Sequence, residues 1–595
     1  MSEFTKIPCW SSNASPPLAE VTKEKCARNE LNKEQLAALE VLTGRHVINA
    51  GAGSGKSSVL IARMLLINKT YPDSKVLMIS FTKKSAMELR DRIGGRTNVT
   101  ISTFHSLAYH IMRSAGLRFT VITSEAEQES VIGRLIKKRK TTIEEVQQSL
   151  HHIEVEDADT KAVREEYLAY LQNHQQTTFD TMQIFALQLL QKDKALLASW
   201  WARADFLLVD EGQDQDAQQL GIIELLSQRT NNLCVCSDTR QSIYSFRGAV
   251  PDAIGKIAEI ATQYDLSINY RSNRAILGLA NEVMAKDKPL LAAVENPAPI
   301  YPKYIMATDG LDEARAVVDE IAFLHKQGQP YKEMTVLFRS CAASSYVVQE
   351  LLKRKIPAIS KGAITLTHTK PPYCGVVRLF RFMLKPGDKD CFKAIMPILY
   401  LRKGMLQTIV TIVVKTGCSL MEATQKLNLP FFHKEYLSEL SDAMIDASKM
   451  TPSQAALHLL QHGYGKYIGP ELTEAIKHMA DELKEYSSIT AYLNFLDDLK
   501  EQAEAMRQLT ATSTDFLELM TIHASKGKEF DTVFLIGAQD GVLPSNHDGV
   551  DIEEERRLLY VAVTRAKERL YISFPRTSEN HKDPNEVSRF LREIF

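Results

Sequence analysis

The stretch HVINAGAGSGKSSVLIARMLLI, residues 46–67, decides the fold. Its start, HVIN (46–49), predicts a strand, and its end, VLIARMLLI (59–67), predicts a helix. Between them, small residues let the backbone amides of 51–57 turn toward a phosphate at the N-terminus of the helix. The stretch therefore predicts a phosphate-binding loop (P-loop), with Ala50 where the usual pattern has its first glycine.

The polar residues of this loop predict its ligand. Lys56 would neutralise the terminal phosphates of a nucleotide, and the Ser57 hydroxyl would bind magnesium. We therefore expect ATP and Mg²⁺ to bind here. The residues predicted to contact the nucleotide in this loop are Ala50, Gly51, Ala52, Gly53, Ser54, Gly55, Lys56, Ser57 and Ser58.

A second apolar run, FLLVDEGQD (206–214), ends in two adjacent carboxylates. Acids at the end of a strand are costly unless they hold a cation or activate water. We predict that Asp210 binds the magnesium, through its water shell, and that Glu211 is the general base for the attacking water. A helix N-cap is the usual role of such a pair when no P-loop precedes it.

Phosphoryl transfer also needs positive charge where the transition state becomes negative. The candidates are Arg271, in NYRS (269–272), and Arg565, in VAVTRAKERL (561–570). The alternative for either residue, taken singly, is a solvated surface group or a salt-bridge partner.

The order of apolar runs predicts the fold class. Near-continuous apolar strands alternate with helical stretches, which is typical of a parallel sheet covered on both faces. Two regions without a strand pattern interrupt the series, at 107–178 and at about 371–513. We therefore expect an α/β protein with two parallel-sheet domains, each with a mainly helical insertion. The predicted strands are 46–49, 75–81, 98–103, 206–210, 233–237, 265–270, 304–307, 334–338, 531–537 and 570–574.

The composition limits how a nucleic acid could bind and indicates the cellular compartment. The formal net charge is −1, from 72 basic and 73 acidic residues, so a nucleic acid would have to bind in a local basic groove. The eight cysteines form no CxxC pair, which argues against a zinc site or a disulfide framework. No run approaches the length of a membrane span and the N-terminus lacks a signal-peptide pattern. We expect a cytoplasmic, nucleoid-associated protein.

The stretch SDTRQSIYSFRGA (237–249) places Gln241, Tyr244, Phe246 and Arg247 close together after an apolar run. Polar and small residues interrupt the aromatic pair, so a buried face of a strand or helix fits poorly. Aromatic side chains offer stacking faces to unpaired bases, worth about 1–3 kcal/mol per base.

The motifs occur together in one order along the chain: LNKEQLAAL, AGAGSGKS, ISFTKKSAMELRDRI, STFHSLA, VDEGQD, SDTRQSIYSFRGA, INYRS, MTIHASKGKEFD and EEERRLLYVAVTRAKERL. In this order they resemble the helicase motifs of the superfamily 1 UvrD/Rep/PcrA family, from about residue 29 to 594. The resemblance implies two RecA-like domains with ATP in the cleft between them. It also implies single-stranded DNA across their top and movement from 3′ to 5′ on that strand.

Domain boundaries follow from the resemblance combined with the strand pattern. Residues 1–28 form an N-terminal arm, and the first RecA-like domain (1A) comprises 29–106 and 179–262 around the insertion 107–178 (1B). The second RecA-like domain (2A) comprises 263–370 and 514–595, around the insertion 371–513 (2B).

The resemblance also implies roles for single residues. Gln35 would read the adenine edge, Tyr270 would stack on the base and Glu529 would contact the ribose. Gln241 would sense the γ-phosphate, and Arg271 and Arg565 would reach it from the second domain. The catalytic set is therefore Lys56, Glu211, Gln241, Arg271 and Arg565. The residues in motifs that line the DNA path are Phe81, Thr82, Thr103, Phe104, His105, Tyr244, Phe246 and His523.

The predicted function is an ATP-dependent DNA helicase or translocase acting on single strands and on junctions with duplex. Two alternatives stay open. One is a translocase that serves a partner nuclease, or another repair or replication factor, and does not unwind duplex by itself. The other is a nucleotide-responsive sensor of DNA ends in phage defence.

Several positions depart from the family pattern or allow a simpler role. Ser58 replaces an arginine that completes an adenine sandwich, and Phe246 replaces a tryptophan. Lys528 replaces a leucine, and Gly212 replaces a bulkier residue. For Phe81 and Phe104 a place in the core is the alternative to DNA contact, and the basic run KKRK (137–140) is best explained as a solvated helix face.

Overall fold

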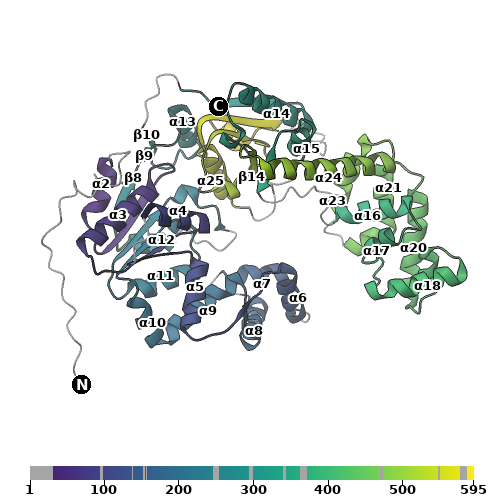
Figure 1. The fold of residues 1–595 in the computed structure, drawn as a ribbon, viewed down its shortest axis with the longest axis horizontal. Coiled ribbons are helices and arrows are strands. Elements are labelled where there is room, and N and C mark those ends of the chain that lie inside the picture. The colour runs from purple at the N-terminus through teal and green to yellow at the C-terminus, as the bar shows by residue number, and fades with distance from the viewer. Residues whose placement is uncertain are drawn as a thin grey trace. The chain divides into compact units, whose positions relative to one another are not determined.

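The chain folds into two compact units, one made of 1–300 with 549–567 and the other of 301–548 with 568–595. Figure 1 shows the fold as a ribbon. The computed structural model describes residues 31–93, 98–136, 139–151, 155, 157–245, 253–293, 299–339, 344–361, 372–468, 473–546, 550–576 and 586–594.

The first unit contains a six-stranded parallel sheet in the order β3-β2-β6-β7-β1-β8. The strand β1, Arg45–Ala50, pairs with both β7 and β8, so the P-loop that follows it starts near one side of the sheet. Crossovers between parallel strands require the helices that alternate with them in the sequence. The other strands are β2 (Val76–Ile79), β3 (Val99–Ser102), β6 (Phe206–Val209), β7 (Leu233–Ser237) and β8 (Thr262–Leu266).

Both faces of this sheet are buried, because successive strand residues point to opposite sides. Leu207 and Val209 pack with helices α5 (Phe104–Ser114), α9 (Phe179–Lys192) and α11 (Ala217–Ser227). Their neighbour Leu208 faces the other core, with α2 (Lys33–Glu40), α3 (Lys56–Thr70) and α4 (Lys83–Ile93). Cys234 and Cys236 also lie in this second core, as expected of alternating apolar positions in a strand.

A helical insertion interrupts the first unit between α5 and α9. It contains α6 (Glu125–Leu135), α7 (Ile143–Ser149) and α8 (Ala158–Asn173), and the short parallel pair β4 (Thr120–Val121) and β5 (Gln176–Thr177) flanks it. Lys137 and Lys138 of the basic run lie outside the described residues. Arg139 of the same run forms ion pairs with Asp159 and Glu166, which agrees with a solvated, ion-paired surface.

The second unit has its own six-stranded parallel sheet, in the order β11-β16-β15-β12-β14-β13. Its helices α14 (Gly310–Lys326) and α15 (Ser345–Lys353) pack on one face of the sheet. The strands are β11 (Lys303–Ala307), β12 (Met334–Phe338), β13 (Ala358–Lys361), β14 (Leu517–Thr521), β15 (Phe530–Leu535) and β16 (Ala566–Pro575).

The second helical insertion has a separate hydrophobic core. The longest helix, α24 (Ile489–Thr512), leads from this insertion back to β14 (Figure 1). No described helix is long and apolar enough to cross a membrane. The other helices of eight residues or more here are α16 (Tyr373–Leu384), α18 (Leu406–Thr416), α20 (Phe431–Ala447), α21 (Pro452–Leu459) and α23 (Thr473–Glu482).

The α/β class with two parallel sheets and helical insertions is confirmed, and three strand predictions need correction. The predicted strand 265–270 is two strands, because β8 ends at Leu266 and β9 (Ile268–Asn269) pairs with β10 (Leu291–Ala292) instead. Between them, both the backbone N–H and the hydroxyl of Ser267 donate to the Glu34 carboxylate. The strands β13 and β14 were missed, since neither carries a long apolar run; β13 pairs with β14, and β14 also pairs with β12.

The contacts of residues 549–567 group them with the first unit. The family resemblance instead assigns this segment to the second RecA-like domain. Where the domain boundaries run stays a prediction.

A buried histidine near the start of β1 makes stability depend on pH. His46 on β1 is 1% exposed, and burial, followed by the charge of Arg63, lowers its pKa to about 4. Between pH 6.5 and 4 the unfolded chain binds a proton that the folded chain does not, so stability is lost as the pH falls through this window. At pH 5 the loss is about 2 kcal/mol.

Urea unfolding of the wild type and of His46→Asn at pH 7.5 and pH 5 measures this term. We expect the pH-dependent loss to be smaller in the variant by about 2 kcal/mol. An equal loss in both proteins would contradict this assignment.

Candidate nucleotide-binding site

The P-loop adopts a conformation that favours glycine at two of its positions. Gly53 and Gly55 have φ values of +65° and +83°, in the left-handed region. A Cβ atom on Gly53 would lie 2.7 Å from the Asn269 side chain, and one on Gly55 would lie 2.8 Å from Gln35. The loop is therefore fixed both by backbone conformation and by close neighbours.

Three donors hold the carbonyl groups of the loop from one side. Gln35 Nε2 donates to Ser54 O at 2.9 Å, Asn269 Nδ2 to Ala52 O at 2.6 Å, and the Tyr270 N–H to Gly53 O at 2.9 Å. In a trans peptide the following N–H points away from the carbonyl oxygen. The N–H groups of Gly53 and Gly55 therefore point to the opposite side of the loop, where a phosphate can accept them.

The loop also contains a buried hydroxyl that has no partner among the described residues. Ser54 is 1% exposed, and its Oγ forms no hydrogen bond there. Lys56 begins α3, so the first N–H groups of that helix have no partner within it. These donors match a polyphosphate in number and kind.

Two carboxylates and a lysine meet beside the loop. Lys56 Nζ lies 3.3 Å from Glu211 Oε2, and burial, followed by the Glu211 carboxylate, raises the pKa of Asp210 to about 7. Burial alone would lower the pKa of Lys56, but Glu211, Asp238 and Asp210 outweigh it and hold that pKa above its ordinary value. Buried acids in this arrangement favour a bound cation, as expected of a magnesium site next to Ser57.

Glu211 has a strained backbone. Its φ and ψ are +53° and +48°, a conformation that costs a residue with a side chain about 1–3 kcal/mol. Gln215 Nε2 donates to the Glu211 backbone carbonyl at 2.9 Å, and Gln213 Nε2 donates to its carboxylate at 2.5 Å. The surrounding structure therefore holds the carboxylate in one place, as expected of a positioned general base.

Gln241 and Arg565 are in direct contact in the first unit. Arg565 Nη2 donates to Gln241 Oε1 at 3.0 Å, and Gln241 Nε2 donates to Asp238 Oδ2 at 2.6 Å. Because Asp238 only accepts, it turns the amide so that its oxygen faces the arginine. Arg271 Nη1 donates to the carbonyl of Thr564, next to Arg565.

The two arginines form a cationic site in which Arg565 is buried and Arg271 is half-buried. Arg565 is 1% exposed, and burial, followed by the charge of Arg271, lowers its pKa to about 9. Two guanidinium groups this close are unfavourable unless anions balance them. The site is therefore suited to a negatively charged ligand such as a phosphate group.

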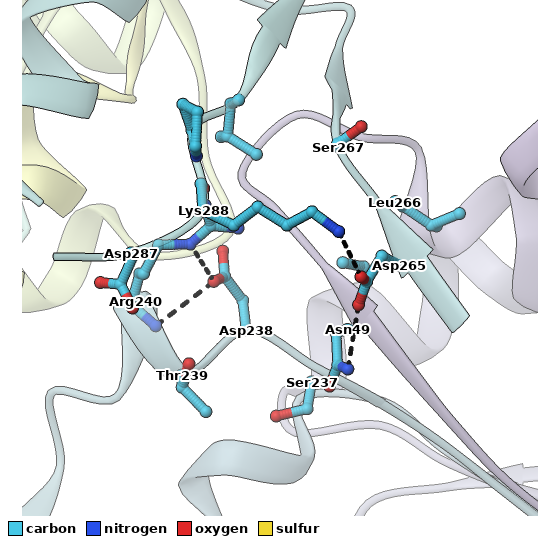
Figure 2. Close-up of a pocket in the computed structure, with 13 residues that line it drawn as sticks. Asn49, Ser237, Asp238, Thr239, Arg240, Asp265, Leu266, Ser267, Asp287 and Lys288 are labelled. Atoms are coloured by element: carbon cyan, nitrogen blue, oxygen red, sulfur yellow. Dashed lines mark hydrogen bonds and ion pairs between the residues drawn. The ribbon is translucent and has the colours of Figure 1, made fainter. Parts of the chain in front are cut away.

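A small cavity of about 140 Å³ lies at the carboxyl ends of β1, β7 and β8. Figure 2 shows two pairs of charged side chains in it: Arg240 Nε donates to Asp238 at 3.0 Å, and Lys288 Nζ donates to Asp265 at 2.7 Å. Asp238 thus lies between Arg240 and Gln241. Sequence reasoning gave Asp238 no role, although an acid three residues before Gln241 in the same motif was the available signal.

The predicted adenine residues surround the start of α3. Gln35 is 5% exposed and also accepts a hydrogen bond from the Asn32 N–H, so its amide braces the loop. Tyr270 is 39% exposed, and its hydroxyl accepts from Asn32 Nδ2. Glu529 precedes β15 in the second unit.

The predicted DNA residues fall into different environments. The rings of Phe81 and Tyr244 stack with centroids 5.4 Å apart, and His105 contacts the ring of Phe179 edge-on at 5.6 Å. Phe104, in contrast, is 3% exposed and belongs to the core, because the first turn of α5 packs on the sheet. This favours the core alternative, so we do not include Phe104 in the proposed DNA path.

The other predicted DNA residues lie on turns and helix ends. Thr82 is exposed and accepts from the Ser85 N–H, and Thr103 is the N-cap of α5. His523 begins a short helical turn in the second unit. Phe246 and Arg247 lie outside the described residues.

Three departures from the family pattern have local explanations. Arg92 Nη2 donates to Ser58 Oγ at 3.3 Å, so a guanidinium from α4 lies beside the position where the family has its arginine. Lys528 forms a 2.7 Å ion pair with Glu518. A Cβ at position 212 would lie 2.4 Å from Val235, so the packing of β7 requires Gly212.

The fold and the site define a P-loop nucleoside triphosphatase with two RecA-like sheets. Residues 31–145 and 122–261 match the UvrD/REP helicase N-terminal domain, and 264–514 and 470–577 match the UvrD-like helicase C-terminal domain. The chain therefore belongs to the UvrD/Rep family of superfamily 1 ATP-dependent DNA helicases, as the motif order indicated.

Relatives cover nearly the whole chain. The chain is 27% identical over 618 residues to the putative ATP-dependent DNA helicase YjcD of Bacillus subtilis, across 94% of this chain and 80% of that protein. It is 28% identical over 650 residues to the ATP-dependent DNA helicase PcrA of Leuconostoc citreum, across 95% and 85%. For PcrA of Staphylococcus aureus the identity is 27% over 639 residues, across 95% and 86%.

Proposed function

We propose that this protein is an ATP-driven motor that moves from 3′ to 5′ along single-stranded DNA and separates duplex ahead of it. The observation that carries the proposal is the convergence of Lys56, Glu211, Gln241 and Arg565 around one P-loop. This set supplies a phosphate cation, a general base, a sensor and a transition-state cation, which together are the parts of an ATP hydrolysis site.

ATP hydrolysis follows from the roles of these side chains. Lys56 binds the terminal phosphates, and Glu211 accepts the proton of the attacking water. Gln241, Arg271 and Arg565 contact the γ-phosphate and stabilise the charge that develops on it. Ser57 and Asp210 hold Mg²⁺, which neutralises charge on the phosphates when bound. Buried Asp210, with its raised pKa, and the unpartnered Ser54 hydroxyl fit this ligand pair.

The nucleotide base and sugar are held by residues around the loop. Tyr270 offers a ring face to adenine, Gln35 its remaining amide hydrogen, and Glu529 contacts the ribose. Ser58 gives no stacking surface, so Arg92 is the guanidinium nearest to that side of the base.

DNA binds through aromatic and polar side chains near the same loop. Tyr244 and Phe81 offer stacked faces to unpaired bases, an interaction that tolerates any sequence. Thr82, Thr103, His105, Phe246 and His523 complete the path in this proposal. The substrate is single-stranded DNA and its junctions with duplex, in the cytoplasm at the nucleoid, with a nuclease or a repair or replication factor as the class of protein partner.

Unwinding of tailed duplexes tests activity, substrate and direction together. With ATP and Mg²⁺ we expect a 3′-tailed duplex to be separated at least tenfold faster than a 5′-tailed or blunt one, because a motor moving 3′ to 5′ needs a 3′ tail to load. Strand separation is followed with a fluorescent strand, and Lys56→Ala is the inactive control. Preference for the 5′ tail would overturn the polarity, and ATP hydrolysis without separation would favour a translocase that works with a partner.

A further inference from the structure

One helix contacts the loop 241–245 at three points. The helix α25, Ile552–Val563, belongs to the same unit as this loop. Arg565, just after the helix, donates to Gln241, and Arg557 Nε donates to the carbonyl of Ser242 at 2.7 Å. Glu554 accepts from the Ser245 N–H at 3.2 Å and also from the Ser245 hydroxyl.

These contacts come from one side of the helix. Residues 554, 557, 561 and 565 follow a spacing of three and four, which places them in one stripe. Arg565 Nε also donates to the Val561 carbonyl at 3.0 Å, so this arginine is tied to the last turn of α25. If Arg565 is displaced, Arg557 and Glu554 therefore move with it as parts of one rigid element.

The loop carries the aromatic side chain that stacks on Phe81. Tyr244 lies between Ser242 and Ser245, the two residues that α25 holds by their backbone groups. Ile243 between them is fully buried, so the loop cannot slide along the helix without losing packing. The position of the Tyr244 ring is consequently set by Arg557 on one side and Glu554 on the other.

The two holding groups are largely shielded from solvent. Glu554 is 8% exposed, and the side chain of Arg557 is 16% exposed. Arg557 also pairs with Asp551 at 3.3 Å, and Glu554 lies close enough to be affected by that arginine. Hydrogen bonds from ionised groups to backbone and hydroxyl partners are stronger than neutral ones, which suits a rigid connection.

From this geometry we infer that Glu554 and Arg557 are positioning residues. They couple the binding of a nucleotide to the position of Tyr244, which is proposed to bind DNA. The inference rests on the proposed function. Neither side chain needs to touch nucleotide or DNA, because each acts by fixing loop 242–245 to the helix that ends beside Arg565. Binding of a phosphate at Arg565 then changes the affinity of the Tyr244 region for DNA, and DNA changes the affinity for nucleotide by the same factor.

The test measures this coupling as a ratio of two affinities. The Kd of the full chain for a fluorescent oligo(dT) is determined with and without Mg²⁺ and a non-hydrolysable ATP analogue. We expect a ratio of at least about fivefold for the wild type. It should fall within twofold of unity for Arg557→Ala and be clearly reduced for Glu554→Gln, because a neutral amide replaces the ionised acceptor of the Ser245 donors and makes weaker hydrogen bonds.

Two further variants separate positioning from a general loss of structure. Glu553→Gln makes the same change on the neighbouring residue, which pairs with Lys286 and Arg556 and not with the loop, and it should keep the wild-type ratio. Arg557→Lys keeps a cationic donor and should restore part of the ratio. Wild-type ratios in both Arg557→Ala and Glu554→Gln, or an equal loss in Glu553→Gln, would overturn the inference.

The same measurements distinguish this inference from the proposed function. If Lys56→Ala abolishes ATP hydrolysis and the wild type shows the coupling, the proposed ATP-driven activity is supported. The Glu554 and Arg557 variants alone then decide the inference. If Lys56→Ala hydrolyses ATP normally, the proposed site fails and the inference falls with it.

Discussion

Glu211→Gln is expected to lower kcat for DNA-stimulated ATP hydrolysis by about 10²–10⁴-fold. The amide keeps the shape of the carboxylate but cannot accept a proton from the attacking water. Binding of single-stranded DNA should survive, because Glu211 contacts Lys56 and Gln213 and is not among the residues proposed for the DNA path. Phosphate release with saturating oligo(dT), beside a filter-binding assay, measures both quantities.

A matched acid elsewhere in the same unit provides the control. Glu224 pairs with Arg45 on the surface, and Glu224→Gln should hydrolyse ATP as the wild type does. Lys56→Ala should match Glu211→Gln in losing hydrolysis, since it removes the cation proposed to bind the terminal phosphates. A wild-type rate in Glu211→Gln or in Lys56→Ala would show that the site is wrongly assigned.

Arg565→Ala should cost about 10³-fold or more in kcat, the range found for arginines that stabilise phosphoryl transfer. The physical reason is the burial of this guanidinium beside Arg271, where water cannot screen the charge it offers to a phosphate. Arg565→Lys should recover only a part, because an ammonium lacks the planar fork that contacts Gln241 and a phosphate together.

For Arg565→Ala, nucleotide binding and turnover are measured separately. Affinity for the Mg²⁺ complex of an ATP analogue should change less than kcat, because Lys56 and the P-loop amides remain. Arg556→Ala, on the same helix but directed to the Val283 carbonyl, is the control and should keep its kcat. If Arg565→Ala retained wild-type turnover, Arg565 would be a structural residue of α25 and not a catalytic one.

The parts of this protein that depend on local pattern could be predicted from sequence. Apolar runs gave β7 and β12 at their observed bounds, because a strand buried on both faces needs apolar residues throughout. The P-loop, with its following helix, and the acids after β6 were equally local, since glycines, a lysine and carboxylates at the ends of strands have few other uses in this order. The motif order then gave the family.

Tertiary structure alone decided which of these side chains meet and which are buried. Phe104 stands in a motif beside His105, yet the packing of α5 turns its ring into the core and leaves His105 outside. The strands β13 and β14 depend on long-range pairing, because β14 lies between β12 and β13, which both precede it by more than 150 residues of sequence. Glu554 and Arg557 gain their roles only from partners brought close by folding. The sequence determined which functional side chains this protein has. Long-range packing determined which of them lie together in a site and which are buried in the core.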